Sequence, residues 1–287
     1  MKKETANTDA SQHKRLVLCF DGTAKTSVRD ESDSEVVKIP QMLDRKAEER
    51  FHYYQAGIGT YVQGDSSRGL CPYLRSFFSI SLNKALGLSL RHHVHAGYRF
   101  IMRHYSPGDY IYIIGFSGGA YTAQFLAEMV DTIGLLSRDN EEMVHIAWKT
   151  FSNFQTSREV RDFGGRTEKD EEAEKYMAGF KKTFCCNEAR VHFLGLFDCV
   201  DLKSQFDFPL TPPSNQHIPA SNIVKHSRHA GSINERRIKF KPALFNLKCG
   251  DKADEDVKEV WFAGTHGCMD GSRVEAGHLL LEWRSGP

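Results

Sequence analysis

The chain has 287 residues, of which 40% are hydrophobic and 26% are charged, and this length is enough for one α/β domain with a sizeable core. Lys and Arg nearly balance Asp and Glu, and the net charge of +1 gives no electrostatic footprint of the kind that binds nucleic acid or an anionic membrane. We therefore expect no nucleic-acid partner and a small-molecule or lipid-like ligand.

The first fourteen residues contain lysines but neither an apolar core nor a small-residue cleavage site, so they do not resemble a secretory signal. We expect residues 1–14 to be a disordered tail. No later run approaches the roughly 18 apolar residues of a membrane span. The seven cysteines are scattered and odd in number, which is typical of free thiols in a reducing compartment. A soluble cytoplasmic protein without a transmembrane segment is expected, in which residues 15–287 form a single domain.

Four short runs have the near-continuous apolar character of strands that are buried on both faces. They read RLVLCF at 15–20, DYIYIIGF at 109–116, VHFLGLF at 191–197 and EVWFAG at 259–264. Helical patterns separate them, and strands that alternate with helices form parallel sheets joined by crossover helices. The sequence therefore predicts an α/β fold with a mostly parallel sheet and helices on both of its faces.

Two helices flank the second of these runs. Before it, apolar residues repeat at helical spacing until SPGD breaks the chain, namely Leu90, Val94, Tyr98, Ile101 and Tyr105. After it, residues 118–136 carry helix formers with an apolar stripe, and Gly134 marks the expected end. The first helix also carries histidines with no carboxylate or cysteine at ligand spacing, namely His92, His93, His95 and His104. We expect a histidine-rich helix face there, and neither a metal nor a cofactor.

Two further stretches differ in character from the rest of the chain. Residues 138–190 place acids early and lysines late in their helical patterns, which complements the helix dipole, and they contain no strand-like run. We expect a helical insertion there that could cap an active site. Residues 202–257 are rich in proline and polar residues, which indicates a long irregular excursion. Within it, HAGSINERRIKF at 229–240 is expected to form a short helix.

The most informative word is GFSGG at 115–119, a G-x-S-x-G pattern between an apolar strand and a helix. A sharp strand-to-helix turn forces the serine into a strained conformation, and small neighbours let the strand and the helix pass closely. Ser117 would then project above the sheet as a nucleophile. The Gly118 N–H, at the start of the helix, would be placed to stabilise a tetrahedral oxyanion. A glycine-rich turn with a solvent-facing serine is the alternative, and the flanking strand and helix favour the nucleophile.

A serine nucleophile needs a histidine base and an orienting acid. α/β enzymes with a G-x-S-x-G turn supply them in the chain order serine, acid, histidine. Asp198 and His266 each follow a strand-like run, at the carboxyl end where ligands bind in open α/β sheets. Asp201 competes as the acid, but Asp198 follows its apolar run directly. Taken singly, an N-capping aspartate and a loop histidine explain these residues as well. Together with Ser117 they predict a Ser117, Asp198 and His266 triad.

The stretch CFDGT at 19–23 has a second interpretation. Phosphatases of the haloacid dehalogenase type carry D-x-D-G-T, in which the first aspartate is the nucleophile and the second is the acid/base. Cys19 occupies the first position here and Asp21 only the second, which disfavours a phosphatase. Beside a serine nucleophile, the same loop has another expected role. An N–H of Gly22 or Thr23 supplies a second oxyanion donor, and Asp21 braces the loop by accepting hydrogen bonds.

Several words occur in the order and approximate spacing of one family, namely CFDGT, YYQAGIGT, GFSGGAYTA, FLGLFDCVD, HAGSINERRIKF and VWFAGTHG. Over residues 14–283 the chain resembles the uncharacterised α/β-hydrolase domain family that includes the type VI secretion phospholipase effectors and is abundant in fungi. The resemblance implies a triad of Ser117, Asp198 and His266, and a phospholipid or another acyl lipid as substrate. That substrate class gives the aromatic segment 73–90 a role in lining an acyl pocket or in a peripheral membrane contact, although core packing explains it equally well.

The chain departs from this family at several positions. Gly118 stands where relatives usually carry arginine, and Cys268 and Asp270 stand where they carry aspartate and glycine. Asn234 opens a word that reads D-E-R-R in relatives. Since the triad positions are retained, we expect a serine hydrolase that cleaves carboxylic esters. A hydrolase-like scaffold that has lost its activity and binds a partner or a ligand is the alternative.

Overall fold

The structure is a computed structural model that describes residues 13–22, 34–43, 49–57, 72–164, 167–186, 188–200, 217–219, 224–237, 240, 242–246 and 256–269. Thr23, Asp201 and Asp270 lie outside these ranges, as do residues 1–12 of the expected tail and most side chains of the aromatic segment 73–90. Among the described residues, no helix has both the length and the apolar composition that crossing a bilayer requires.

A six-stranded sheet forms the centre of the molecule, and every neighbouring pair of its strands runs parallel. In order across the sheet, the strands are β10 (Asp256–Phe262), β8 (His226–Ser232), β6 (Val191–Phe197), β3 (Tyr110–Phe116), β1 (Arg15–Phe20) and β2 (Arg50–Gln55). The four strands expected from apolar runs are β1, β3, β6 and β10. The α/β class is thus confirmed, with a sheet that is parallel throughout.

Strand β8 corrects the expectation for the segment that contains it. Its sequence, HSRHAGS, lies inside the expected irregular excursion, and the helix expected at 229–240 is wrong because β8 and a loop occupy its first part. Hydropathy missed the strand because its inward side chains are polar. Ser227 and His229 are buried, and His229 is hydrogen-bonded through one ring nitrogen to the N–H of Cys199, just beyond β6, and through the other to Glu259 of β10. Polar side chains can be buried in a sheet when they are hydrogen-bonded, so such a strand shows no apolar run in the sequence.

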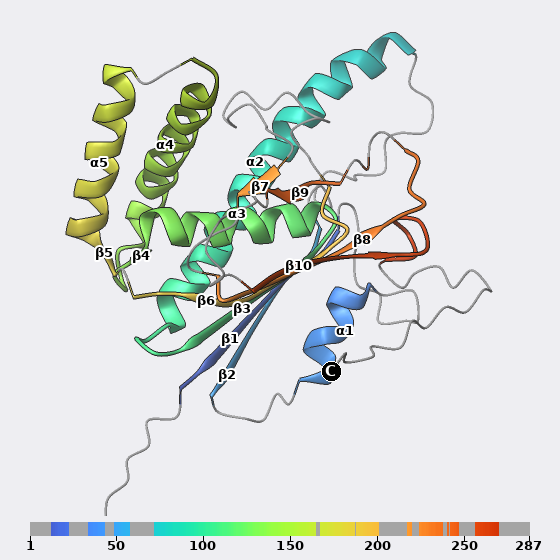
Figure 1. Ribbon diagram of the computed structural model, residues 1–287, viewed down its shortest axis with the longest axis horizontal. Coiled ribbons are helices and arrows are strands. Elements are labelled where there is room, and N and C mark those ends of the chain that lie inside the picture. Colours follow the sequence, from blue (N-terminus) through green and yellow to red (C-terminus); the bar gives the residue numbers. More distant parts are fainter. Residues whose placement is uncertain are drawn as a thin grey trace, which may run out of the picture.

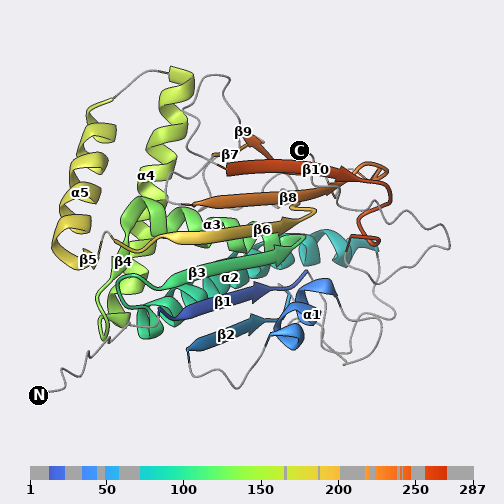
Figure 2. The same cartoon turned by 60° about the horizontal axis from the view of Figure 1, so that its bottom comes forward.

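Helices cover both faces of the sheet, because side chains along each strand alternate between the two faces. They are α1 (Glu35–Met42), α2 (Pro72–His104) and α3 (Gly118–Ile133). Leu16 and Leu18 of β1 belong to the main core with residues of α2 and α3, whereas Val17 and Cys19 belong to a second core with Val36 of α1. Figures 1 and 2 show α2 and α3 on one side of the sheet and α1 on the other.

Two more helices and two small sheets complete the described fold. The helices are α4 (Val144–Gly164), which follows the short 3₁₀ turn η1 (Glu141–Met143), and α5 (Glu168–Phe184). The small sheets pair β4 (Leu135–Leu136) with β5 (Cys185–Cys186) antiparallel, and β7 (His217–Pro219) with β9 (Leu244–Asn246) parallel. Helices therefore dominate the segment 138–190 as expected, apart from the two-residue strand β5.

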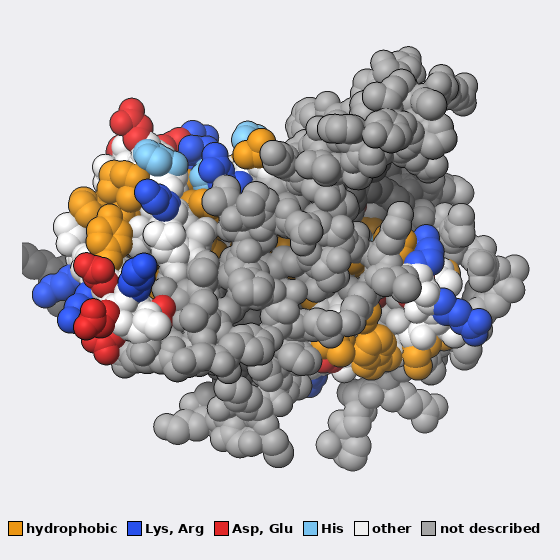
Figure 3. All heavy atoms as spheres, turned by 90° about the horizontal axis from the view of Figure 1, so that it is seen from above, with side chains coloured by type: hydrophobic (Ala, Val, Ile, Leu, Met, Phe, Trp, Pro, Cys, Tyr) orange, Lys and Arg blue, Asp and Glu red, His pale blue; other side chains and the backbone are white. Residues whose placement is uncertain are grey.

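The α4 and α5 pair does not cap the carboxyl edge of the sheet. Lys181 of α5 donates hydrogen bonds to the carbonyl oxygens of Asp131 (2.9 Å) and Thr132 (3.2 Å), which lie in the last turn of α3. Ser117 precedes the first turn of that helix, and sixteen residues of helix rise about 24 Å. Figure 2 shows the pair beside the amino ends of the strands. The expected cap is therefore wrong for these helices. Figure 3 shows that side chains of both charge signs are mixed on the surface at this end of the molecule.

Tyr98 ties the end of α3 to the core. Its side chain is fully buried, its hydroxyl donates to the carbonyl oxygen of Gly134 (2.8 Å), and it accepts from the N–H of Leu136 (3.0 Å). Gly134 ends α3 at a φ of 86°, a conformation that glycine adopts without strain. One phenol therefore pairs two buried backbone groups in the turn that leaves the helix.

Replacing Tyr98 with Phe should leave both backbone groups without their partner while keeping the ring. We expect the free energy of unfolding to fall by about 1–3 kcal/mol in urea titrations. Tyr176→Phe is the matched control, because that side chain is 60% exposed, and its effect should stay within about 0.5 kcal/mol. Equal stability of the two variants would contradict the role assigned to the Tyr98 hydroxyl.

Candidate active site

The hydrogen-bond ladder of the sheet continues one residue beyond the ends of β3 and β6. The N–H of Ser117 donates to the carbonyl oxygen of Phe197 (2.9 Å), and the N–H of Asp198 donates to that of Ala230 (2.7 Å). Because all six strands are parallel, their carboxyl ends meet at one edge, and the side chains that follow them gather there. The sheet thus presents Ser117 and Asp198 side by side.

Ser117 occupies a strained turn between β3 and α3. Its φ of 55° and ψ of −122° lie in a region that residues other than glycine rarely adopt. The glycines of the G-x-S-x-G word make the turn feasible. A Cβ atom on Gly115 would lie 2.4 Å from the carbonyl oxygen of Gly119, and one on Gly119 would lie 2.2 Å from that of Phe20. Both glycines are therefore required by close backbone contacts, as the sequence predicted for this turn.

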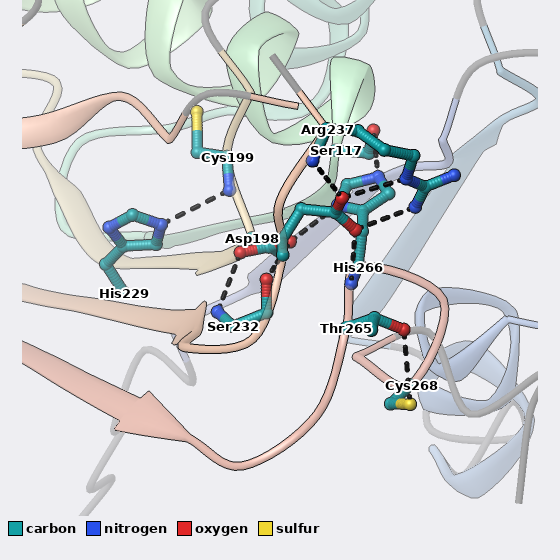
Figure 4. Close-up of polar contacts among 10 residues, drawn as sticks. Ser117, Asp198, Cys199, His229, Ser232, Arg237, Thr265, His266 and Cys268 are labelled. Atoms are coloured by element: carbon teal, nitrogen blue, oxygen red, sulfur yellow. Dashed lines mark hydrogen bonds and ion pairs between the residues drawn. The ribbon is translucent and has the colours of Figure 1, made fainter. Parts of the chain in front are cut away.

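His266 joins Ser117 to Asp198 (Figure 4). Its Nε2 lies 2.8 Å from Ser117 Oγ, and its Nδ1 lies 2.5 Å from Asp198 Oδ2. A carboxylate only accepts, so Nδ1 carries the proton, and in the neutral ring Nε2 accepts from the serine hydroxyl. All three side chains are buried. The structure therefore brings together the serine, acid and histidine that the sequence singled out from three strand ends.

Asp198 is held ionised by a second set of donors. The N–H and the hydroxyl of Ser232, at the end of β8, donate to its two carboxylate oxygens at 2.8 Å each. Burial alone would raise the pKa of Asp198, but the hydrogen bonds from His266 and Ser232 outweigh burial and hold this pKa below its usual value. The carboxylate is therefore charged at neutral pH and opposite the Nδ1–H of His266.

Aromatic rings flank the imidazole of His266. Phe116 stacks on it with ring centroids 4.9 Å apart, and Phe240 lies at 4.5 Å with an interplanar angle of 37°. The preceding loop turns at Gly264, whose φ of 128° suits glycine and where a Cβ would meet Cys268 at 2.9 Å. Packing against these two rings limits the orientations that the imidazole adopts.

The backbone after Asp198 is fixed by a buried histidine. Cys199 donates its N–H to Nε2 of His229 (3.2 Å), and Nδ1 of His229 lies 2.9 Å from Glu259 Oε1. In Figure 4 the Cys199 thiol points away from this imidazole. His229 therefore contacts the backbone that carries Asp198, and it does not form a thiol pair with Cys199.

The start of the loop after β1 lies next to Ser117. A Cβ on Gly22 would meet the ring of Phe116 at 2.7 Å and Cβ of Ser117 at 3.5 Å. Asp21 accepts hydrogen bonds from the N–H of Gly22 (2.7 Å) and from the hydroxyls of Ser34 and Tyr54, at 2.8 Å each. Asp21 thus braces the loop by accepting three hydrogen bonds, and it engages the Gly22 N–H that was one candidate oxyanion donor.

The contacts of Asp21 and Cys19 argue against the phosphatase interpretation. Cys19, in place of the nucleophilic aspartate, is fully buried. Its burial, with the nearby charge of Asp21, raises the pKa of its thiol to about 12. Both carboxylate oxygens of Asp21 are hydrogen-bonded. Neither side chain is placed to attack or protonate a phosphate ester.

Two of the four histidines of α2 are buried and pack inside the protein. His93 and His95 are buried, and burial, with smaller contributions from neighbouring positive groups, lowers the pKa of each to about 4. The His95 ring lies 5.4 Å from that of Trp148. Within the described ranges, no group of three or more His, Cys, Asp or Glu side chains is arranged to hold a metal ion.

Several residues at this edge were missed from the sequence, namely Ser232, Glu235, Arg237 and Phe240. Ser232 ends β8 and the others follow it, all in the word HAGSINERRIKF that was expected to be helical. Glu235 accepts the backbone N–H of His266 at 3.1 Å, and Arg237 donates to the Glu235 carboxylate. The repeated occurrence of this word in the family was the available signal, but the polar character of β8 concealed its position at the site.

An all-parallel sheet with helices on both faces, and a serine, an aspartate and a histidine joined at its carboxyl edge, defines an α/β-hydrolase-like protein. The family described as "T6SS, Phospholipase effector Tle1-like, catalytic domain" matches residues 14–283. The chain therefore belongs to this family, as the resemblance of its motifs implied.

One relative and one solved structure are similar to the chain. It is 34% identical over 242 residues to the uncharacterized protein YEL023C of Saccharomyces cerevisiae (strain ATCC 204508 / S288c), a match that covers 82% of the chain and 33% of the yeast protein. The chain thus spans about a third of the length of that relative. A crystal structure of an uncharacterized protein from Pseudomonas aeruginosa is 17% identical, with a TM-score of 0.37, over 89% of the chain and 41% of that protein.

Replacing Gly119 with Ala should disrupt the turn that holds Ser117. The added Cβ would lie 2.2 Å and 2.4 Å from the carbonyl oxygens of Phe20 and Asp21, so the backbone must shift. We expect the free energy of unfolding to fall by about 1–3 kcal/mol. Gly179→Ala is the matched control: nothing lies within 4 Å of that position in α5, and the variant should be about 0.5–1 kcal/mol more stable. Unchanged stability of the Gly119 variant would contradict the close contact.

The Glu235 carboxylate should make the fold sensitive to acid. Hydrogen bonds from Arg237 lower the pKa of Glu235 to about 2, against about 4.3 in an unfolded chain. Its contribution to stability is therefore complete above about pH 4.3 and is lost as the pH falls toward about 2. Arg237→Ala removes the main cause, so this variant should lose less stability than the wild type between about pH 5 and pH 3.

Urea unfolding across this pH range measures the difference, and Arg236→Ala serves as control. Arg237 is 57% exposed, so salt should reduce the effect. Parallel pH profiles for the wild type and the Arg237 variant would disprove the coupling.

Proposed function

We propose that the chain is a serine hydrolase that cleaves carboxylic esters, with phospholipid or another acyl lipid as its substrate class. The observation that carries this proposal is the hydrogen-bonded chain from Ser117 Oγ through His266 to Asp198. The description of the family as a phospholipase effector catalytic domain supports a lipid substrate and hydrolase activity. A peripheral contact with a lipid surface is part of the same proposal.

The reaction begins with attack of Ser117 Oγ on the acyl carbonyl carbon. His266 Nε2 takes the hydroxyl proton as the new C–O bond forms, and Asp198 stabilises the imidazolium through the Nδ1–H. The tetrahedral intermediate collapses, the ester C–O bond breaks, and His266 gives its proton to the leaving alkoxide. Water then attacks the acyl-serine with His266 again as base, and the carboxylic acid departs.

The developing oxyanion needs donors beside Ser117. The N–H of Gly118 opens α3, where unpaired amides and the helix dipole favour negative charge. The Gly22 N–H is engaged by Asp21 in this structure, so the proposal assigns the second donor to Thr23, outside the described residues. Gly22 then serves to bring this loop close to Ser117.

An inactive binding scaffold is the second candidate, and two observations favour it. Gly118 replaces the arginine that is usual in the family, and Cys268 replaces an aspartate in the loop after His266. The Cys268 thiol lies 3.5 Å from Thr265 Oγ1 and not at the imidazole. Fluorophosphonate labelling separates the two candidates, because only an activated serine reacts with the probe.

Replacing Ser117 with Ala should abolish both labelling by a fluorophosphonate probe and hydrolysis of p-nitrophenyl esters. We expect the rate to fall by a factor on the order of 10⁴ or more, because the nucleophile is removed. Ser137→Ala, at an exposed serine, is the control and should retain full activity.

A panel of phospholipids and other acyl esters then defines the substrate. Unchanged ester hydrolysis in the Ser117 variant would end the proposal. Hydrolysis of p-nitrophenyl phosphate that needs Mg²⁺ but not Ser117 would revive the phosphatase.

A further inference from the structure

We propose that Glu235, Arg237 and Phe240, here called the histidine latch, hold His266 in its working orientation, and that Glu235 is a positioning residue for the reaction. This inference rests on the proposed function. The latch belongs to the loop that follows β8, whereas His266 belongs to the loop that follows β10.

The two loops are bonded on both sides of Thr265. Asn234 donates its N–H to the carbonyl oxygen of Gly264 (3.0 Å) and accepts the N–H of Gly264 at Oδ1 (2.9 Å). Glu235 accepts the N–H of His266 at Oε2 (3.1 Å). The backbone that carries the imidazole is therefore fixed by consecutive side chains from the neighbouring strand end.

Arg237 fixes the carboxylate that makes this contact. Its Nε donates to Oε1 (2.8 Å) and its terminal nitrogen to Oε2 (2.7 Å), a two-pronged geometry, and its backbone N–H donates to Oε1 as well (2.8 Å). The Glu235 side chain is only 6% exposed. Both oxygens are thus held in one orientation, with Oε2 facing the His266 N–H.

Arg237 also acts on the imidazole of His266 indirectly, because it packs on Phe240, which contacts that imidazole. Its guanidinium lies 4.1 Å from the centroid of Phe240, and Phe240 lies 4.5 Å from the His266 ring. One side chain therefore constrains both the backbone of His266 and, through Phe240, its imidazole, against which Phe116 also stacks.

A purely structural ion pair explains these contacts less well. Arg237 is 57% exposed, so solvent screens much of the stability that the pair gives to the whole fold. The other effect of the Arg237–Glu235 pair is local: it orients His266, which must align one ring nitrogen with Ser117 and the other with Asp198. Small displacements of a catalytic group lower the rate strongly, by about 100-fold for about 1 Å.

Kinetics of Glu235→Ala, Glu235→Gln and Arg237→Ala on a soluble p-nitrophenyl ester test the latch, with Arg236→Ala as the matched control. We expect kcat to fall about 10- to 100-fold in the Glu235→Ala and Arg237→Ala variants, with KM close to the wild-type value. Glu235→Gln keeps one acceptor oxygen and should fall between them and the wild type. Arg237→Lys restores the charge without the two-pronged geometry and should recover only part of the rate.

A second readout does not depend on turnover. In protein with ¹⁵N-labelled histidine, the Nδ1 proton shared with Asp198 gives a strongly deshielded signal in proton NMR. This signal should broaden or disappear in the Glu235→Ala and Arg237→Ala variants and persist in Arg236→Ala. Melting temperatures, measured for every variant, set an assay temperature below all transitions.

The outcomes separate the latch from the proposed function. Wild-type kcat and an intact imidazole signal in the Glu235→Ala and Arg237→Ala variants would overturn the latch, whatever the substrate. A raised KM at unchanged kcat would also overturn it, because it would mark Arg237 as a substrate contact. If instead the wild type lacks ester hydrolysis and probe labelling, the proposed function fails, and the NMR signal still decides whether the latch holds His266.

Discussion

The contact of α3 with the end of β1 admits no side-chain atom at Gly119, and the geometry of the carboxyl edge follows from this close approach. With the helix so near the sheet, the turn before it holds Ser117 at a positive φ, and its N–H continues the ladder to Phe197. Asp198 repeats the arrangement one strand further, at a φ of 43° with its N–H on Ala230. Backbone strain at the two positions is thus offset by the sheet itself, so the side chains need no flexible loop to meet.

Much of this arrangement was accessible from the sequence, because it follows from the rules of parallel sheets. Strands buried on both faces must be nearly continuous in apolar residues, and β1, β3 and β6 were found on that ground. The carboxyl ends of parallel strands share an edge, so residues that directly follow such runs must be neighbours. That single rule placed Ser117, Asp198 and His266 together. The glycines around Ser117 indicated the strained turn that joins β3 to α3.

The remainder was hidden because its stabilising contacts are polar or long-range. Strand β8 carries a buried histidine, His229, whose partners are Cys199, just beyond β6, and Glu259 of β10, and no local periodicity records such pairings. Glu235 lies in a word that predicted a short helix, and its contact with the N–H of His266 joins residues that are far apart in the sequence. The direction of α4 and α5 away from the site depends on contacts such as Lys181 with the end of α3, which amphipathic patterns do not specify. Element type was therefore easier to infer than element position.

The order of the strands along the chain sets when the site can form. Ser117 and Asp198 follow β3 and β6, whereas His266 follows β10, which lies at the opposite edge of the sheet from β2. During synthesis, folding proceeds from the amino end, so a growing chain on the ribosome holds the serine and the aspartate before the histidine has been translated. Only the pairing of β10 with β8 delivers the imidazole. Until β10 has been made and paired, Ser117 lacks its hydrogen bond to His266, so the site, like the described sheet, is completed by the last of these six strands.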